Sequence, residues 1–190
     1  LRYLERCGAK TLNAIARDDF TTRLEQIWQK ASSPATFIPS SDKTEDWVRL
    51  VTGDGDPQIG KMIFQSSWSI CQTCHQVDSW GGIIGPDLSH IGGSKSVEQL
   101  VRAIVEPSAE IAPEWQGWFV TTQEGETHYG RQIDVGLHNV ELMLSDGEFV
   151  TFKEPKDYGI FPNSLMSPGL QNNLSAAEFN DLIHYLVSLK

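Results

Sequence analysis

Two thiols and an imidazole lie within five consecutive residues of this chain. They belong to Cys71, Cys74 and His75, in the order Cys-Gln-Thr-Cys-His. At this spacing each thiol can add to one vinyl group of a haem as a thioether, and the adjacent histidine can bind the iron from the same face. The pattern therefore predicts one covalently attached haem c, with His75 as an iron ligand.

The same thiols would also suit a thioredoxin-like dithiol or half of a zinc site. A dithiol motif needs a strand before it and a helix after it, whereas a turn-rich stretch at 78–85 follows this one. A four-ligand zinc site needs a second Cys/His pair, but the only other cysteine is Cys7, and His128 and His138 form no tight pair. We favour haem attachment, which leaves Cys7 as a free thiol or as a partner in an intermolecular disulfide.

The sixth iron position decides between electron transfer and ligand binding. A methionine raises the reduction potential, a second imidazole lowers it, and an empty position binds a small ligand. Met166 lies in an irregular loop with Pro168, and such a loop can present a side chain across the haem from His75. We expect His75 and Met166 to be the axial ligands. Weaker candidates, expected in packing, strand, loop or surface positions, are Met62, Met143, His90, His128, His138 and His184.

Hydrophobic periodicity predicts the elements that position these side chains. Helices are expected over 1–32, over 44–52, over 57–67, from Ser96 to just before Pro107, and from Ser175 onward. Ser175 and Glu178 have the spacing of a capping box. Four β-rich runs separated by turns are expected over 118–122, 127–133, 139–144 and 149–152.

These elements predict a mainly α fold with a small antiparallel β insertion at about 115–152, preceded by short N-terminal helices. We expect an N-terminal helical segment over 1–50 and a haem domain over 53–190. The predicted first helix already includes Leu1, so we expect the chain to be a fragment of a longer protein.

The amino-acid composition argues against some classes of binding partner. The chain has 190 residues, of which 39% are hydrophobic and 21% charged, with a net charge of −10. This acidic balance argues against a nucleic acid or an anionic membrane as the main partner. No run of 18 apolar residues occurs, so no membrane span is expected. Covalent haem attachment takes place outside the bacterial inner membrane, so we expect a periplasmic or secreted location.

Several motifs resemble class I cytochrome c. Gly60 and Phe64 resemble its first helix, where a glycine permits close crossing by the last helix, and Tyr185 resembles the aromatic position on that last helix. The resemblance implies a cytochrome c-like helical haem domain.

The loop after the haem motif carries a second part of the resemblance. Gly85-Pro86-Asp87-Leu88 is similar to the loop whose proline carbonyl accepts a hydrogen bond from the iron-bound histidine. The resemblance implies that Gly85, Pro86 and Leu88 belong to the cofactor site. Pro86 would orient His75, and Leu88 would pack on the haem.

The chain resembles most closely the haem-binding domain at the C-terminus of large planctomycete- and verrucomicrobium-type secreted proteins. That family has a Gly-Pro-Asp-Leu-Ser loop, a Glu-Pro-Ser segment, a β insertion and a Met-Pro-x-Gly-Leu ligand loop. The matching segments are 85–89, 106–108, 115–152 and 166–170, although the proline of the last comes one place later. The likeness covers about 53–190 and implies that 1–50 ends a helical-repeat region.

The expected function is electron transfer through a single haem, without catalytic residues. The module would take electrons from a dehydrogenase module and pass them to another cytochrome or an oxidase. The alternatives are a haem enzyme or small-ligand sensor with an open or displaceable sixth site, which would need a distal group such as His128, and a structural haem domain. The insertion would be a lid over the haem edge or a docking surface. Trp115 and Trp118 at its entry would anchor the sheet or shield the haem propionates.

Overall fold

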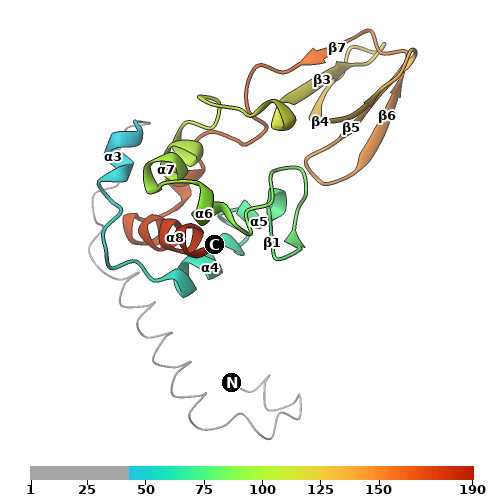
Figure 1. The fold of residues 1–190 in the computed structure, drawn as a ribbon. Coiled ribbons are helices and arrows are strands. Elements are labelled where there is room, and N and C mark those ends of the chain that lie inside the picture. Colours follow the sequence, from blue (N-terminus) through green and yellow to red (C-terminus); the bar gives the residue numbers. More distant parts are fainter. Residues whose placement is uncertain (1–42) are drawn as a thin grey trace, which may run out of the picture. The chain divides into compact units, whose positions relative to one another are not determined.

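A computed structural model describes residues 43–190, which fold as a helical part and a five-stranded sheet (Figure 1). The helix predicted over 1–32 lies outside these described residues. The helices and 3-10 turns, in chain order, are α3 (Thr44–Val48), α4 (Pro57–Phe64), α5 (Cys71–Cys74), α6 (Ile91–Ser94), α7 (Val97–Val105), η1 (Pro113–Trp115), η2 (Leu170–Asn173) and α8 (Ala176–Ser188). The strands are β1 (Gln76–Val77), β2 (Trp80–Gly81), β3 (Gly117–Thr121), β4 (Thr127–Val135), β5 (Asn139–Met143), β6 (Phe149–Lys153) and β7 (Asp157–Ile160).

Helices α4 and α8 begin where the sequence supplies a cap. The Asp56 carboxylate accepts the backbone N–H of Gln58 at 2.8 Å, and Pro57 occupies the first turn, where its missing N–H costs nothing. At α8, the Ser175 side chain accepts the backbone N–H of Glu178 while the Glu178 carboxylate accepts the N–H of Ser175. The capping box predicted at Ser175 is therefore confirmed.

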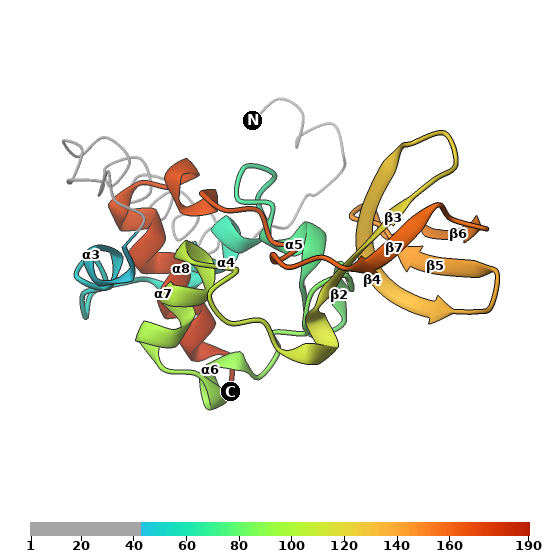
Figure 2. The same cartoon turned by 90° about the horizontal axis from the view of Figure 1, so that it is seen from above.

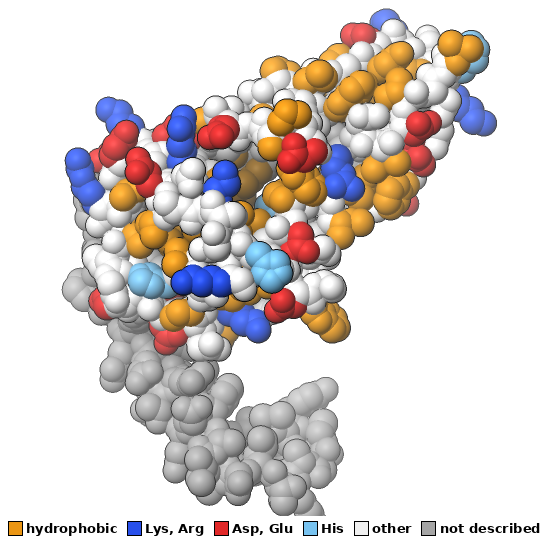
Figure 3. Space-filling model, viewed as in Figure 1, with side chains coloured by type: hydrophobic (Ala, Val, Ile, Leu, Met, Phe, Trp, Pro, Cys, Tyr) orange, Lys and Arg blue, Asp and Glu red, His pale blue; other side chains and the backbone are white. Residues whose placement is uncertain are grey.

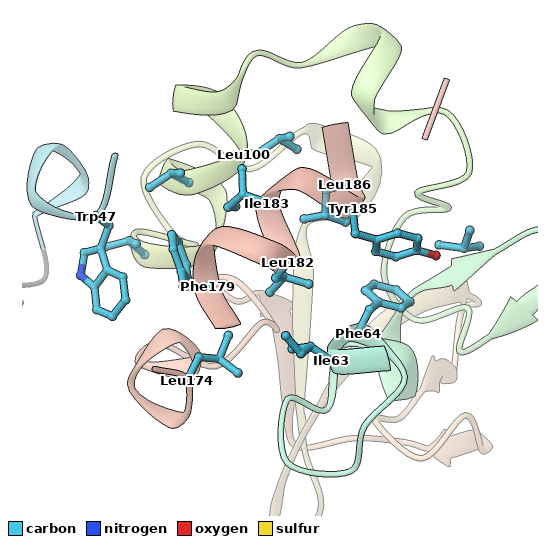
Figure 4. Packing of buried hydrophobic residues seen from close by; sticks show 13 residues of the cluster. Trp47, Ile63, Phe64, Leu100, Leu174, Phe179, Leu182, Ile183, Tyr185 and Leu186 are labelled. Carbon is cyan, nitrogen blue, oxygen red and sulfur yellow. The ribbon is translucent and has the colours of Figure 1, made fainter. Parts of the chain in front are cut away.

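The core of the helical part forms where α4 crosses α8. A Cβ at Gly60 would lie 2.0 Å from the Asp181 carbonyl oxygen, so only glycine allows the helices to approach this closely. The close crossing predicted at Gly60 is confirmed. The Phe64 and Tyr185 rings meet beside it, with centroids 5.6 Å apart and planes at 57° (Figure 4). Around them lie the buried side chains of Trp47, Ile63, Leu100, Val101, Val105, Leu174, Phe179, Leu182, Ile183 and Leu186.

Helix α3 is tied to the end of α7 by one carboxylate. Glu106 Oε1 accepts the Thr44 backbone N–H at 3.2 Å and the Thr44 hydroxyl at 2.5 Å. These hydrogen bonds favour the ionised carboxylate and lower the pKa of Glu106 below its usual value. They bring the fully buried Trp47 against Phe179, with ring centroids 4.8 Å apart.

Strands β3 to β7 form one antiparallel sheet in the order β6-β5-β4-β3-β7. Both ribbon views show it extending from the helical part rather than covering a helix layer (Figures 1 and 2). The sheet has a core of its own, because the buried side chains of one face pack together: Val120, Val140, Leu142 and Phe152. His128 on β4 contacts Phe152 on β6 at 4.9 Å between ring centroids, although β5 lies between these strands. The sheet therefore curls over this face.

The expected mainly α fold class is wrong. Of the described residues, 34% are helical and 22% are in strands, which makes the fold mixed α and β. Part of the difference lies in strands that were not predicted: β1 and β2 after the motif, and β7 at Asp157–Ile160, which pairs with β3 at the sheet edge. The sheet therefore occupies 117–160 and exceeds the predicted insertion at its C-terminal end.

A second, two-stranded sheet follows the haem motif directly. Strands β1 and β2 pair Val77 with Trp80, which leaves a two-residue loop. Asp78 and Ser79 in that loop both have positive φ, 52° and 68°. Positive φ at both central positions is what a type I′ hairpin turn requires. The turn-rich stretch predicted after the motif is thus a tight hairpin followed by a glycine loop.

Candidate haem attachment site

Cys71 and Cys74 lie on the single turn of helix α5. Residues three apart on a helix share a face, so both thiols point to the same side. Neither is in a disulfide. Burial is the main cause that raises the pKa of both thiols above the ordinary value. Two neutral, unbridged thiols on one face are the arrangement that a haem with two vinyl groups needs.

His75 follows α5 in extended backbone and makes one defining contact. Its Nδ1 lies 2.9 Å from the Pro86 carbonyl oxygen. A carbonyl can only accept, so Nδ1 carries the proton, and Nε2 of the neutral ring keeps its lone pair. Burial lowers the pKa of His75, and the hydrogen bond to Pro86 opposes that shift only in part. The contact expected between His75 and Pro86 is present, and it leaves a neutral nitrogen available to a metal.

Glycines let the following loop press against the motif. Gly85 donates its N–H to the Cys74 carbonyl at 2.8 Å, and a Cβ on Gly85 would lie 2.6 Å from His75 Cε1. Gly82 donates to Gln72 O at 2.8 Å, and a Cβ there would lie 1.9 Å from a backbone oxygen of α5. Gly85 was a predicted site residue. Gly82 was missed, although two consecutive glycines so soon after the motif were a signal of close approach.

Leu88 is half-buried and packs against the core of the helical part. Its N–H donates to the Gln76 carbonyl at 2.9 Å. Asp87 fixes the turn beside it by accepting the Ser89 N–H at 2.8 Å and the Gln76 side-chain amide at 2.8 Å. These bonds hold Leu88 next to the motif, and its expected packing on a haem stays a prediction.

Met166 is half-buried in a loop that is tied at two points. Its N–H donates to Ser164 Oγ at 3.1 Å, and the Ser164 N–H donates to Ser108 Oγ at 3.1 Å. Ser108 belongs to the Glu-Pro-Ser segment after α7, so this segment supports the predicted ligand loop. The two segments also line a hollow of about 400 Å³, with Pro168 and Gly169 on one side. The loop is thereby held in place without a regular element.

The other two methionines lie elsewhere. Met62 is 56% exposed on α4, and Met143 is fully buried in β5. Both agree with the packing or surface positions expected for them.

The remaining histidines also have other surroundings. His90 and His138 are exposed. His128, expected to face solvent, is half-buried, 3.8 Å from Glu126 and against Phe152. His184, expected on the helix surface, is half-buried as well, and its Nε2 lies 2.6 Å from the Thr52 carbonyl oxygen.

These residues fit a haem better than a bare metal ion. Among residues 43–190, no three Cys, His, Asp or Glu side chains converge where one ion could be held. A haem needs no such convergence, since two thiols would bond its vinyl groups and its iron would take one side chain on each face, His75 on one and Met166 on the other. The loop also passes so close to the His75 ring that a Cβ at Gly85 would lie 2.6 Å from Cε1.

The segment around the motif carries little charge and several exposed hydrophobic side chains. Between Ser66 and Pro86 the only charged side chain is Asp78. Four large hydrophobic side chains of this segment are exposed: Trp68, Ile70, Trp80 and Ile83. Figure 3 shows further hydrophobic side chains gathered over the sheet.

No helix among residues 43–190 is long and apolar enough to span a membrane, as expected.

Comparison with family models found no match to this chain. Comparison with curated proteins found none that is significantly similar.

Proposed function

We propose that residues 53–190 form a c-type cytochrome domain of the class I kind, which carries single electrons. One haem would be attached through Cys71 and Cys74, with His75 and Met166 as its axial ligands. The observation that carries the proposal is the hydrogen bond from His75 Nδ1 to the Pro86 carbonyl at 2.9 Å. It sets the tautomer, fixes the ring and increases the basicity of Nε2, as the partner of a metal-bound histidine does.

The packing of α4 against α8, called the helical frame below, supports the same proposal. The crossing at Gly60 and the contact between Phe64 and Tyr185 are the features that the resemblance to class I cytochrome c implied. They join the helix before the motif to the last helix of the chain. The Met166 loop leads through the short turn η2 into α8, so both predicted ligands lie on segments that adjoin this helix pair. Their placement on opposite sides of one haem is part of the proposal.

The protein's own groups would tune the bound cofactor, which supplies the one-electron ferric/ferrous couple. A neutral imidazole and a thioether add no charge to the iron, and a thioether favours the ferrous state. The half-buried site limits access of water, which also favours the less charged ferrous form. With both axial positions filled by side chains, the domain would exchange electrons without binding a substrate at the iron.

The partner would be another redox protein that docks next to the motif. The exposed side chains of Trp68, Ile70, Trp80 and Ile83 surround a segment with a single charge, so we expect contact through apolar surface. A dehydrogenase module, another cytochrome or an oxidase would serve. The covalent attachment chemistry implies a periplasmic or secreted location.

The test is to express the chain in a bacterial periplasm together with a c-type haem attachment system. We expect a mass increase of one haem that survives denaturation and a low-spin spectrum with the weak far-red band of sulfur bound to ferric iron. The variant His75→Ala should lose haem incorporation. Absence of covalent haem in the wild-type chain would refute the proposal. A high-spin spectrum that shifts with carbon monoxide or cyanide would instead favour a ligand-binding haem protein.

A further inference from the structure

One face of the five-stranded sheet meets the Met166 loop. A Cβ on Gly117 of β3 would lie 3.0 Å from the Leu165 side chain, whose residue precedes Met166. On the same face Tyr129 contacts Phe161, with ring centroids 4.8 Å apart. The face opposite the sheet's own core is therefore the one turned toward the predicted ligand loop.

Arg131 lies on this face at the end nearest the loop. It pairs with Gly117 on β3 and with Met143 on β5, and directly paired residues project to the same side of a sheet. Met143 is fully buried although it is not part of the sheet's own core, so this end of the face is covered. Arg131 therefore projects into the region where the sheet joins the Met166 loop.

The guanidinium of Arg131 is held by an aromatic ring. Its Cζ lies 5.1 Å from the centroid of the Trp115 ring, which is a cation–π contact. Between Gly117 and Ile160 the chain has eight acidic and three basic side chains. Although acidic side chains outnumber basic ones in this segment, Arg131 forms no ion pair with any residue of the described range. Within residues 43–190 the guanidinium of Arg131 therefore has no carboxylate partner.

We propose that Arg131, oriented by Trp115, binds a propionate of the haem. The inference rests on the proposed function, since a propionate is the carboxylate that a haem brings to its pocket. A planar guanidinium suits a carboxylate because it can donate two parallel hydrogen bonds. The sheet would then contribute to the cofactor site, and Trp115 would orient the propionate-binding residue rather than only anchor the sheet.

The pairing has two measurable consequences. A positive charge beside the haem stabilises the ferrous state relative to the ferric state, which carries one more positive charge, so it raises the reduction potential. It also stabilises the ionised propionate and so lowers the pKa of that carboxyl, by about 1 to 3 pH units for a close arginine. Since ionisation of a propionate lowers the potential, the pH at which the potential falls reports this pKa.

The test compares Arg131→Gln with two controls in the haem-loaded chain. Arg131→Gln should keep covalent haem and a low-spin spectrum, lower the reduction potential, and move its pH-dependent fall about 1 to 3 pH units higher. Arg131→Lys keeps the charge and should restore most of the potential. Lys153→Gln removes an equal charge from β6, which is not next to the Met166 loop, and should match the wild type.

Equal potentials and pH profiles in Arg131→Gln and Lys153→Gln would overturn the inference. The proposed function would stand, because covalent haem and the spectrum of the wild type are measured in the same samples. If the wild type held no covalent haem, both would be refuted.

Discussion

Replacing Gly60 by alanine tests the helix crossing on which the candidate site depends. A Cβ there would lie 2.0 Å from the Asp181 carbonyl oxygen and 2.7 Å from Tyr185 Cβ, whereas ordinary contacts begin near 3.4 Å. Because the first obstacle is backbone, no side-chain rotation relieves it, and α4 and α8 must separate by roughly 1 Å. A gap of that size forfeits about a quarter to a half of each contact between the helices.

Two effects of opposite sign decide the outcome. Alanine is favoured over glycine inside a helix by about 1 kcal/mol. Overpacking costs about 1 to 3 kcal/mol or more, and a clash with backbone lies at the upper end of that range. We therefore expect Gly60→Ala to lower the free energy of unfolding by about 2 kcal/mol, or Tm by roughly 4 to 8 °C.

Urea and thermal unfolding of matched samples, all with haem or all without, measure this change. Gly53→Ala is the control, because nothing lies within 4 Å of the Cβ position at Gly53. It should leave Tm almost unchanged. If Gly60→Ala were as stable as the wild type, or more stable, helix propensity would dominate and the close crossing described here would be incorrect.

Three further predictions concern the site and its frame. Met166→Ala should keep the covalent haem but give a high-spin or ligand-accepting iron by absorption spectroscopy; an unchanged spectrum would show that another group is the sixth ligand. Gly85→Ala would place a Cβ 2.6 Å from His75 Cε1, so the ring should move and its hydrogen bond to Pro86 should weaken. We expect this to lower the free energy of unfolding by about 1 kcal/mol. No change in urea unfolding would contradict the close approach of Gly85 to the His75 ring. The pKa of Glu106 is lowered by its hydrogen bonds to Thr44, so its stabilising effect is present above the carboxyl's ordinary pKa and is lost as the pH falls through the lowered value. Glu106→Gln should therefore destabilise the chain more at pH 7 than at acid pH by thermal unfolding, and an equal effect at both would mean that the charge is unimportant.

Local signals predicted the helical frame well. The cap at Ser175 and the proline after Asp56 mark helix starts through contacts within three residues, which a sequence displays directly. The close helix crossing at Gly60 was predicted only from the resemblance to class I cytochrome c, because a single glycine in a sequence does not indicate which helix packs against it. The helix starts were therefore predicted from short-range patterns, and the crossing was predicted from a known family pattern.

The sheet shows where sequence reasoning failed. Strand β7 has only four residues, one of them Gly159, and its partner β3 lies far away in the sequence. Its existence depends on that non-local pairing rather than on its own propensity, so it was not predicted. The mainly α fold class was wrong partly for this reason and partly because β1 and β2 were also missed.

The candidate site was predicted in part. Cys71, Cys74 and His75 follow from one short motif, and the Pro86 contact from a resemblance. The approach of Arg131 to the Met166 loop was not predicted, because it depends on which face of β4 turns toward that loop. A register shift between Gln132 and Asp134 alters this alternation along β4, and a sequence does not display it.

The chain enters and leaves the five-stranded sheet at neighbouring points. The Gln116 side-chain amide donates to the Phe161 carbonyl at 2.6 Å, and the Phe161 N–H donates to the Gly117 carbonyl at 2.8 Å. Since the sheet has its own core, a short linker could replace it at little entropic cost to closing the chain. We therefore expect the helical part to fold with the whole sheet replaced by a short linker, since the two ends of the sheet segment already lie side by side.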